Sequence, residues 1–184
     1  MADSNKKEIE RIHSKIHSNK ENDIIEGIEK MRTSGNSQML AELLSVLETN
    51  PPIEVTDKIF QLLNDLKVQN SAEMLIQFIE NHKNSPHLKE LISACWQNGL
   101  DYSQNIELFT SLALENDYLV AIEVFSVIQE NIELVSEAKR FEIAGALNSK
   151  LKNQNDPEKK KIIHEIISLI QPVSGPFIFN KNVP

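Results

Sequence analysis

His13 and His17 stand four residues apart, a spacing that places two imidazole rings on one face of a helix and can bring both onto one metal ion. A structural or catalytic metal site needs at least a third ligand, and the sequence positions no cysteine or acidic side chain so as to identify one. Glu10 precedes His13 by three residues and could assist, but the face that the two share is equally well explained as an ordinary polar face. We therefore expect no bound metal and no cofactor.

The only cysteine, Cys95, lies beside the only tryptophan, Trp96. A reactive thiol needs a nearby base, and His87 is eight residues earlier, too far along a helix to activate it. The thiol instead continues an apolar series that consists of Leu88, Leu91 and Ile92. We expect a buried structural thiol. Because the sequence also has no glycine-rich phosphate loop, paired-carboxylate motif or nucleophile elbow, we expect no enzymatic activity.

The segment from Cys95 to Tyr102 is the least regular part of the central region. Trp96 precedes Gly99, which can close a helix in the left-handed conformation, and Asp101 can cap the helix that follows. One interpretation is therefore a corner between two helices, covered by Trp96. The other is a partner-binding site in which Trp96, Asp101 and Tyr102 take part, since tryptophan and tyrosine dominate interface hot spots.

The formal charge of −8 is unevenly distributed along the chain. Residues 1–32 are balanced, residues 33–89 carry −3 and residues 139–184 carry +4. Residues 90–138 contain no lysine or arginine and nine acidic residues, which are Glu90, Asp101, Glu107, Glu115, Asp117, Glu123, Glu130, Glu133 and Glu137. We call residues 90–138 the acidic block. Such a surface attracts basic peptides and repels phosphate backbones, although ordinary solvated helix faces would also carry these side chains.

Two pairs of acidic residues in this block are spaced to share a helix face. Glu107 and Glu115 lie about two turns apart, as do Glu123 and Glu130. With Trp96, Asp101 and Tyr102 they form our candidate partner-binding set. A basic stretch follows the block, with lysines at 150, 152, 159, 160 and 161, and it is more easily explained by helix ends than by a phosphate contact.

Apolar residues recur along the chain with a long period, which indicates the helices on which the candidate side chains lie. One column is Leu40, Leu75, Leu108 and Ile143, with steps of 35, 33 and 35 residues. A second column, one helical turn later, has the same steps and consists of Leu44, Ile79, Leu112 and Leu147. A period in this range with two helices per unit is typical of an α-solenoid.

Caps, prolines and apolar spacing predict ten helices. Their expected ranges are 5–17, 20–33, 37–49, 52–66, 71–82, 86–98, 103–115, 118–130, 137–152 and 157–171. Residues 1–171 should form one domain with repeat units at about 20–50, 51–84, 85–116 and 117–153, the end helices 5–17 and 157–171 shielding the stack. Ser18 with Glu21 predicts a capping box, and Asp156-Pro157 predicts an N-cap. Residues 172–184 should be a non-helical tail, whose Pro-Phe-Ile-Phe run at 176–179 could dock as a strand.

Composition agrees with a mainly helical protein of a reducing compartment. Five glycines and seven prolines are too few for a β protein rich in tight turns. A single cysteine cannot form an internal disulfide, and no apolar run approaches the ~18 to 20 residues of a membrane span. The polar N-terminus lacks the apolar region of a secretory signal. We expect a cytoplasmic protein that does not associate with membranes.

In its period, paired helices and apolar columns, the chain resembles the HEAT and armadillo-like α-helical repeat superfamily over residues 20–153. The resemblance implies an all-α fold, a right-handed α-α superhelix of about four helical pairs with capping helices, whose second helices line a concave binding surface. Members bind peptides or proteins, a minority bind nucleic acid, and a few are DNA glycosylases. The alternative fold is a globular all-α bundle.

These observations favour a non-enzymatic repeat scaffold that binds another protein or peptide, a basic one, through the acidic block. A nucleic-acid-binding HEAT-type protein or DNA glycosylase-like enzyme is the first alternative, and the acidic central units argue against it. A structural subunit of a larger assembly, docked through the first helix or the tail, is the second.

Overall fold

The computed structural model describes residues 2–34, 39–152 and 154–171, and within these ranges it is all-helical, with no strand. The helices are α1 (Ala2–Ile16), α2 (Glu21–Ser34), α3 (Leu40–Leu47), α4 (Ile53–Asn64), α5 (Asn70–Asn81), α6 (Leu88–Gln97), α7 (Ile106–Glu115), α8 (Tyr118–Asn131), α9 (Glu137–Leu151) and α10 (Pro157–Ile170). Two short 3-10 turns, η2 (Ser103–Asn105) and η3 (Ile132–Leu134), precede α7 and follow α8. Every predicted helix therefore coincides with an observed one, whereas Gly35 and the tail 172–184 lie outside the described residues.

Local signals set two of the helix ends as predicted. Asp156 caps α10, because its carboxylate accepts hydrogen bonds from the backbone N–H groups of Glu158 at 2.9 Å and Lys159 at 3.1 Å. Gly99 closes the turn after α6 with a φ of +69°, in the left-handed region that glycine tolerates best.

The predicted capping box between Ser18 and Glu21 is wrong. The Ser18 hydroxyl accepts a hydrogen bond from the backbone N–H of Lys20 at 3.1 Å and donates one to the carboxylate of Asp23 at 3.0 Å. With α2 beginning at Glu21, Ser18 lies too far before the helix to act as its N-cap.

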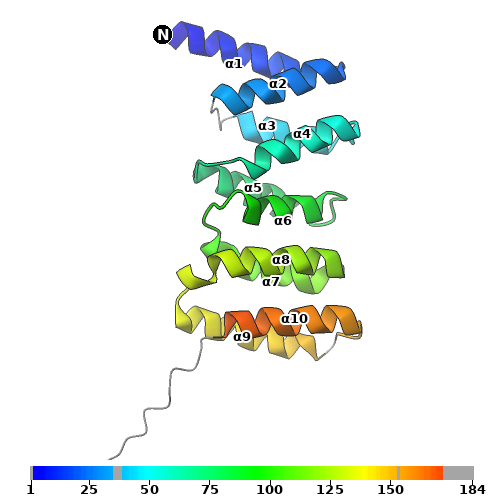
Figure 1. Cartoon of the computed structure of the whole chain (residues 1–184), viewed down its shortest axis with the longest axis vertical. Coiled ribbons are helices and arrows are strands. Elements are labelled where there is room, and N and C mark those ends of the chain that lie inside the picture. The colour runs from blue at the N-terminus through cyan, green and yellow to red at the C-terminus, as the bar shows by residue number, and fades with distance from the viewer. Residues whose placement is uncertain (1, 35–38, 153, 172–184) are drawn as a thin grey trace, which may run out of the picture.

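The helices form two rows that run along the long axis of the molecule in chain order (Figure 1). In the even row each helix contacts the next, from α2 through α4, α6 and α8 to α10. The odd row contains α1, α3, α5, α7 and α9, with contacts of α3 to α1 and α5 and of α7 to α9. Between the rows the main contacts join α1 to α2, α5 to α6, α7 to α8 and α9 to α10.

The contacts group the helices one step out of phase with the predicted units. Only residues 116 and 117 join α7 to α8, so the two helices turn back on each other as a hairpin. The predicted unit 85–116 instead joins α6 and α7, which the eight residues 98–105 separate and which belong to different rows. A repeat boundary can be drawn in either phase, so the unit boundaries stay a prediction.

The apolar columns lie in the core. Leu44, Ile79, Leu112 and Leu147 are all at least 98% buried, as their shared column predicts. In the other column Leu108 is partly exposed, while Leu40, Leu75 and Ile143 are buried. The core extends along the whole stack, from Ile12 in α1 to Ile170 in α10. Among the described helices, none has both the length and the apolar character that a membrane span requires.

Candidate partner-binding surface

Tyr102 does not lie on a surface. Its side chain is fully buried, its ring packs edge-on against Phe109, and its hydroxyl donates to the Asn98 side-chain oxygen at 3.3 Å. Burial raises the pKa of the Tyr102 hydroxyl well above its usual range. The assignment of Tyr102 to a partner-binding set is therefore wrong, because the aromatic ring that sequence placed at an interface fills the core beneath the corner.

A buried amide, Asn98, organises the corner between α6 and α7. Its side-chain oxygen accepts from the backbone N–H of Leu100 at 3.0 Å, and its amide nitrogen donates to the Tyr102 hydroxyl at 3.0 Å and to the Leu63 carbonyl at 3.4 Å. On α8, Asn131 accepts from the backbone N–H of Tyr102 at 2.7 Å. Three successive even helices are thus joined through one corner.

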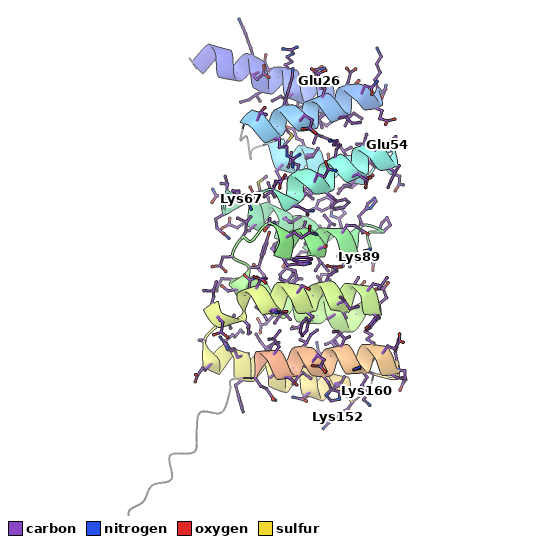
Figure 2. The ribbon with its side chains drawn as sticks, viewed as in Figure 1. Glu26, Glu54, Lys67, Lys89, Lys152 and Lys160 are labelled. Atoms are coloured by element: carbon purple, nitrogen blue, oxygen red, sulfur yellow. The ribbon has the colours of Figure 1, made fainter. Side chains whose placement is uncertain are left out.

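Asp101 also serves this corner. Its carboxylate accepts a hydrogen bond from the backbone N–H of Ser103 at 2.8 Å, two residues on, which orders the turn that leads into η2. The N-cap residues are Tyr102 for η2 and Asn105 for α7, so the predicted capping of the next helix by Asp101 is wrong. Its backbone forms two hydrogen bonds with the Gln69 side chain, at 2.7 and 3.0 Å. Lys67, labelled at the side of the stack in Figure 2, donates to the Asn98 carbonyl at 3.0 Å. The exposed Asp101 carboxylate therefore has a structural role.

The sequence interpretation missed Asn98 and Asn131, although a signal for them exists. Asn64, Asn98 and Asn131 lie at the ends of α4, α6 and α8, with steps of 34 and 33 residues that match the apolar period. A polar residue recurring at the end of alternate helices indicates hydrogen bonds between successive units, which an apolar pattern alone does not reveal.

Cys95 is the buried structural thiol that was expected. It is fully buried, and its Sγ lies 3.4 Å from the carbonyl oxygen of Leu91. Burial raises the pKa of the thiol to about 12, so the thiolate that nucleophilic chemistry requires is scarce at neutral pH.

Trp96 is the predicted site residue with an accessible aromatic ring. It is 37% exposed at the end of α6, and its indole N–H donates to the Glu123 carboxylate on α8 at 2.8 Å. The hydrogen bond holds the ring across the boundary between two neighbouring helices of the even row. The ring is therefore partly fixed while one side stays open to solvent.

Basic residues that flank the acidic block fold back and neutralise part of it. Lys139 contacts Glu107 at 2.7 Å, and Lys89 contacts Glu90 at 3.1 Å. The hydrogen bond to Glu107 raises the pKa of Lys139. Arg140 lies 3.4 Å from Glu133 in the same way. The acidic block is therefore less negative than its sequence indicates, at Glu90, Glu107 and Glu133.

The remaining candidate carboxylates are divided between the two rows. Glu115, on α7, accepts a hydrogen bond from the Ser111 hydroxyl at 2.7 Å and lies in the odd row with Glu107. Glu123 and Glu130 lie on α8 in the even row, with Trp96 of α6 beside Glu123. Within the described ranges neither Glu123 nor Glu130 forms an ion pair with a lysine or arginine.

Only some of the lysines in the basic stretch that follows the acidic block, residues 150–161, are exposed to solvent. Lys159 is buried and donates to the Leu114 carbonyl of α7 at 2.6 Å, which ties α10 to the odd row. Lys152 and Lys160 project from the end of the stack beside α10 (Figure 2). The first turn of α10 thus has a packing role in addition to its solvated lysines.

No protein-family model matches this chain, and neither a curated protein nor a solved structure matches it significantly.

Proposed function

We propose that this protein is a non-enzymatic scaffold of the HEAT and armadillo-like type, a right-handed superhelix of stacked helical hairpins that binds a basic segment of another protein. Two observations support the solenoid. Seven of the eight residues in the apolar columns of period 33 to 35 are buried between α3 and α9, and the helices mainly contact the next helix of their row and their hairpin partner. A globular bundle would instead bring helices far apart in the chain together.

With the repeat units drawn in the phase of the contacts, as hairpins from α1–α2 to α9–α10, the second helices form the even row, which is then the better candidate for the concave side. Contacts between neighbouring even helices are more extensive than those between neighbouring odd helices, as between α6 and α8 compared with α7 and α9. In a curved stack the elements on the inner side approach one another more closely. Trp96, Glu123 and Glu130 belong to this row, and we call these three residues the α6–α8 surface.

The α6–α8 surface carries the proposal because its groups suit one kind of ligand. An arginine guanidinium could form an ion pair with the Glu123 carboxylate and stack on the exposed face of the Trp96 indole. Glu130 is two turns further along the same face of α8 and could hold a second basic residue of an extended peptide. Neither carboxylate forms an ion pair with a described lysine or arginine, while Glu123 accepts the Trp96 indole N–H and interacts electrostatically with Lys89.

A peptide selection tests this function. Random peptides displayed as a library would be selected on the full-length protein at low salt, and the binding of selected peptides measured by fluorescence anisotropy. We expect enrichment of arginine and lysine, and binding that weakens as salt rises, since exposed charges attract over about 10 Å at 0.1 M ionic strength. Glu123→Gln with Glu130→Gln should weaken binding, and Trp96→Ala should mainly speed dissociation.

The matched control is Glu115→Gln with Glu137→Gln, which removes the same charge from the odd row. These changes should leave peptide binding nearly intact. Selected peptides without basic residues, or an equal loss in both double variants, would contradict the proposal. Tight binding of duplex DNA by the wild-type protein in the same assay would favour the nucleic-acid alternative.

A further inference from the structure

The structure brings a carboxylate to the histidine pair of the first helix. His13 and His17 lie on α1, and Glu42 lies on α3, 25 residues beyond His17. One oxygen of Glu42 is 3.3 Å from Nε2 of His13 and 3.4 Å from Nε2 of His17. The three ligand atoms all lie within 4.8 Å of one another. The sequence expectation of no metal rested on the lack of a third ligand, and that premise does not hold.

The spacing of these atoms suits a tetrahedral transition-metal ion. Zinc binds imidazole nitrogen and carboxylate oxygen at about 2.0 to 2.2 Å, so two ligand atoms at a tetrahedral angle are about 3.3 Å apart. The two nitrogen–oxygen distances agree with this value, and the two nitrogens lie within 4.8 Å of each other. Without a metal, the same distances correspond to ion pairs of both imidazoles with the carboxylate, and for His17 to a hydrogen bond, so metal binding itself distinguishes the two arrangements. Both imidazoles also converge on the same carboxylate oxygen.

The helices that carry the ligands are fixed by the core. Ile12 and Ile16 of α1 are buried beside the two histidines, and Leu43 of α3 is buried beside Glu42. α1 also packs closely on α2 at Gly27, where an added Cβ would lie 3.1 Å from Ile16 Cγ1. Ligands on rigid elements need little reorganisation to bind a metal.

We propose that His13, His17 and Glu42 bind one divalent transition-metal ion, with zinc as the ion best suited to two imidazoles and a carboxylate. The side chains are 54%, 45% and 41% exposed, so water can complete the coordination and the ion can exchange with solvent. Because the ligands come from α1 and α3, the bound ion would link α1 to α3 and so stabilise the packing of α1 on the stack. This inference is independent of the proposed peptide-binding function.

Calorimetric titration of the full-length, tag-free protein with zinc sulfate, after removal of metals by a chelator, tests the site. We expect one zinc per chain, and a rise in the melting temperature on zinc addition because the ion binds only the folded state. Cobalt(II) should give the visible absorption of a tetrahedral site. His17→Ala and Glu42→Gln should each abolish stoichiometric binding and the zinc-dependent stabilisation.

His164→Ala is the matched control, because it removes an exposed histidine from α10, at the other end of the stack. It should retain one zinc per chain. Absence of zinc binding by the wild-type protein at tens of micromolar metal would overturn the proposal, as would binding that survives Glu42→Gln and His17→Ala. Circular dichroism of each variant shows whether it is folded. If the His17→Ala variant does not fold, the nearly isosteric Glu42→Gln variant provides the test of the metal site.

Discussion

At the scale of the residue, the corner after α6 shows how one buried amide can determine a local structure. Asn98 satisfies backbone and side-chain groups from its own corner and from α4, and Asn131 extends the network to α8. Buried polar groups are costly when they lack partners, so a network of this kind specifies one arrangement of the chain. Tyr102 belongs to that network, which is why its side chain is buried and does not lie on the surface.

Replacing Asn98 with alanine should destabilise the protein by about 1 to 3 kcal/mol, because the Leu100 N–H and the Tyr102 hydroxyl lose a buried partner. Urea unfolding followed by circular dichroism measures the loss. The control is Asn64→Ala, which removes an amide from the same position of the preceding even helix. Asn64 donates to Gln97 in an exposed hydrogen bond, so its loss should be small. Equal losses in the two variants would contradict a special role for the corner.

At the scale of the element, side-chain caps mark the starts of α8, α9 and α10, and burial along the helices follows the apolar period. Asp156 caps α10, and Gly99 provides the left-handed residue after α6. Short signals are decided by a few neighbouring residues, so they can be recognised without knowledge of the tertiary fold. The predicted capping box at Ser18 is wrong for a local reason as well, since a serine near a helix can form hydrogen bonds with several neighbouring groups, here the Lys20 N–H and the Asp23 carboxylate.

Replacing Leu112 with alanine should cost about 2 to 5 kcal/mol of folding free energy, because the side chain is fully buried in α7 and its removal leaves a cavity. Leu119→Ala in α8 is the matched control, since Leu119 is 54% exposed and its truncation should change stability by less than about 0.5 kcal/mol. Chemical denaturation of both variants measures the difference. A Leu112 loss no larger than that of Leu119 would defeat the repeat register.

At the scale of the whole molecule, contacts connect neighbours along two rows, and the even row is further linked by side-chain pairs. Lys58 of α4 contacts Glu29 of α2 at 2.9 Å, and its hydrogen bond lowers the pKa of that carboxyl. Trp96 joins α6 to α8 in the same row. An architecture of neighbour contacts should lose stability in steps as end units are removed, whereas a single closed core should not tolerate their removal.

A truncated chain of residues 1–135, which lacks α9 and α10, tests this architecture. We expect it to stay helical with a lower melting temperature, because α8 loses its contact with α10 while α1 to α5 keep their neighbours. Hydrogen exchange should rise in α7 and α8 and stay nearly unchanged in α1 and α2. Global loss of helical structure in the truncated chain would favour a globular bundle instead.

The sequence by itself determined the helical class, the approximate positions of the helices and most of the buried column positions, because these depend on spacing and on residues a few positions apart. Only the tertiary structure decided which groups come into contact when 25 or more residues separate them in the sequence. It paired Glu107 with Lys139, placed Glu42 beside His13 and His17, and buried Tyr102 under a corner. Those outcomes depend on how the rows of helices pack, which the local sequence does not encode. For the same reason, the acidic residues form one block along the chain but are divided between two rows in the structure.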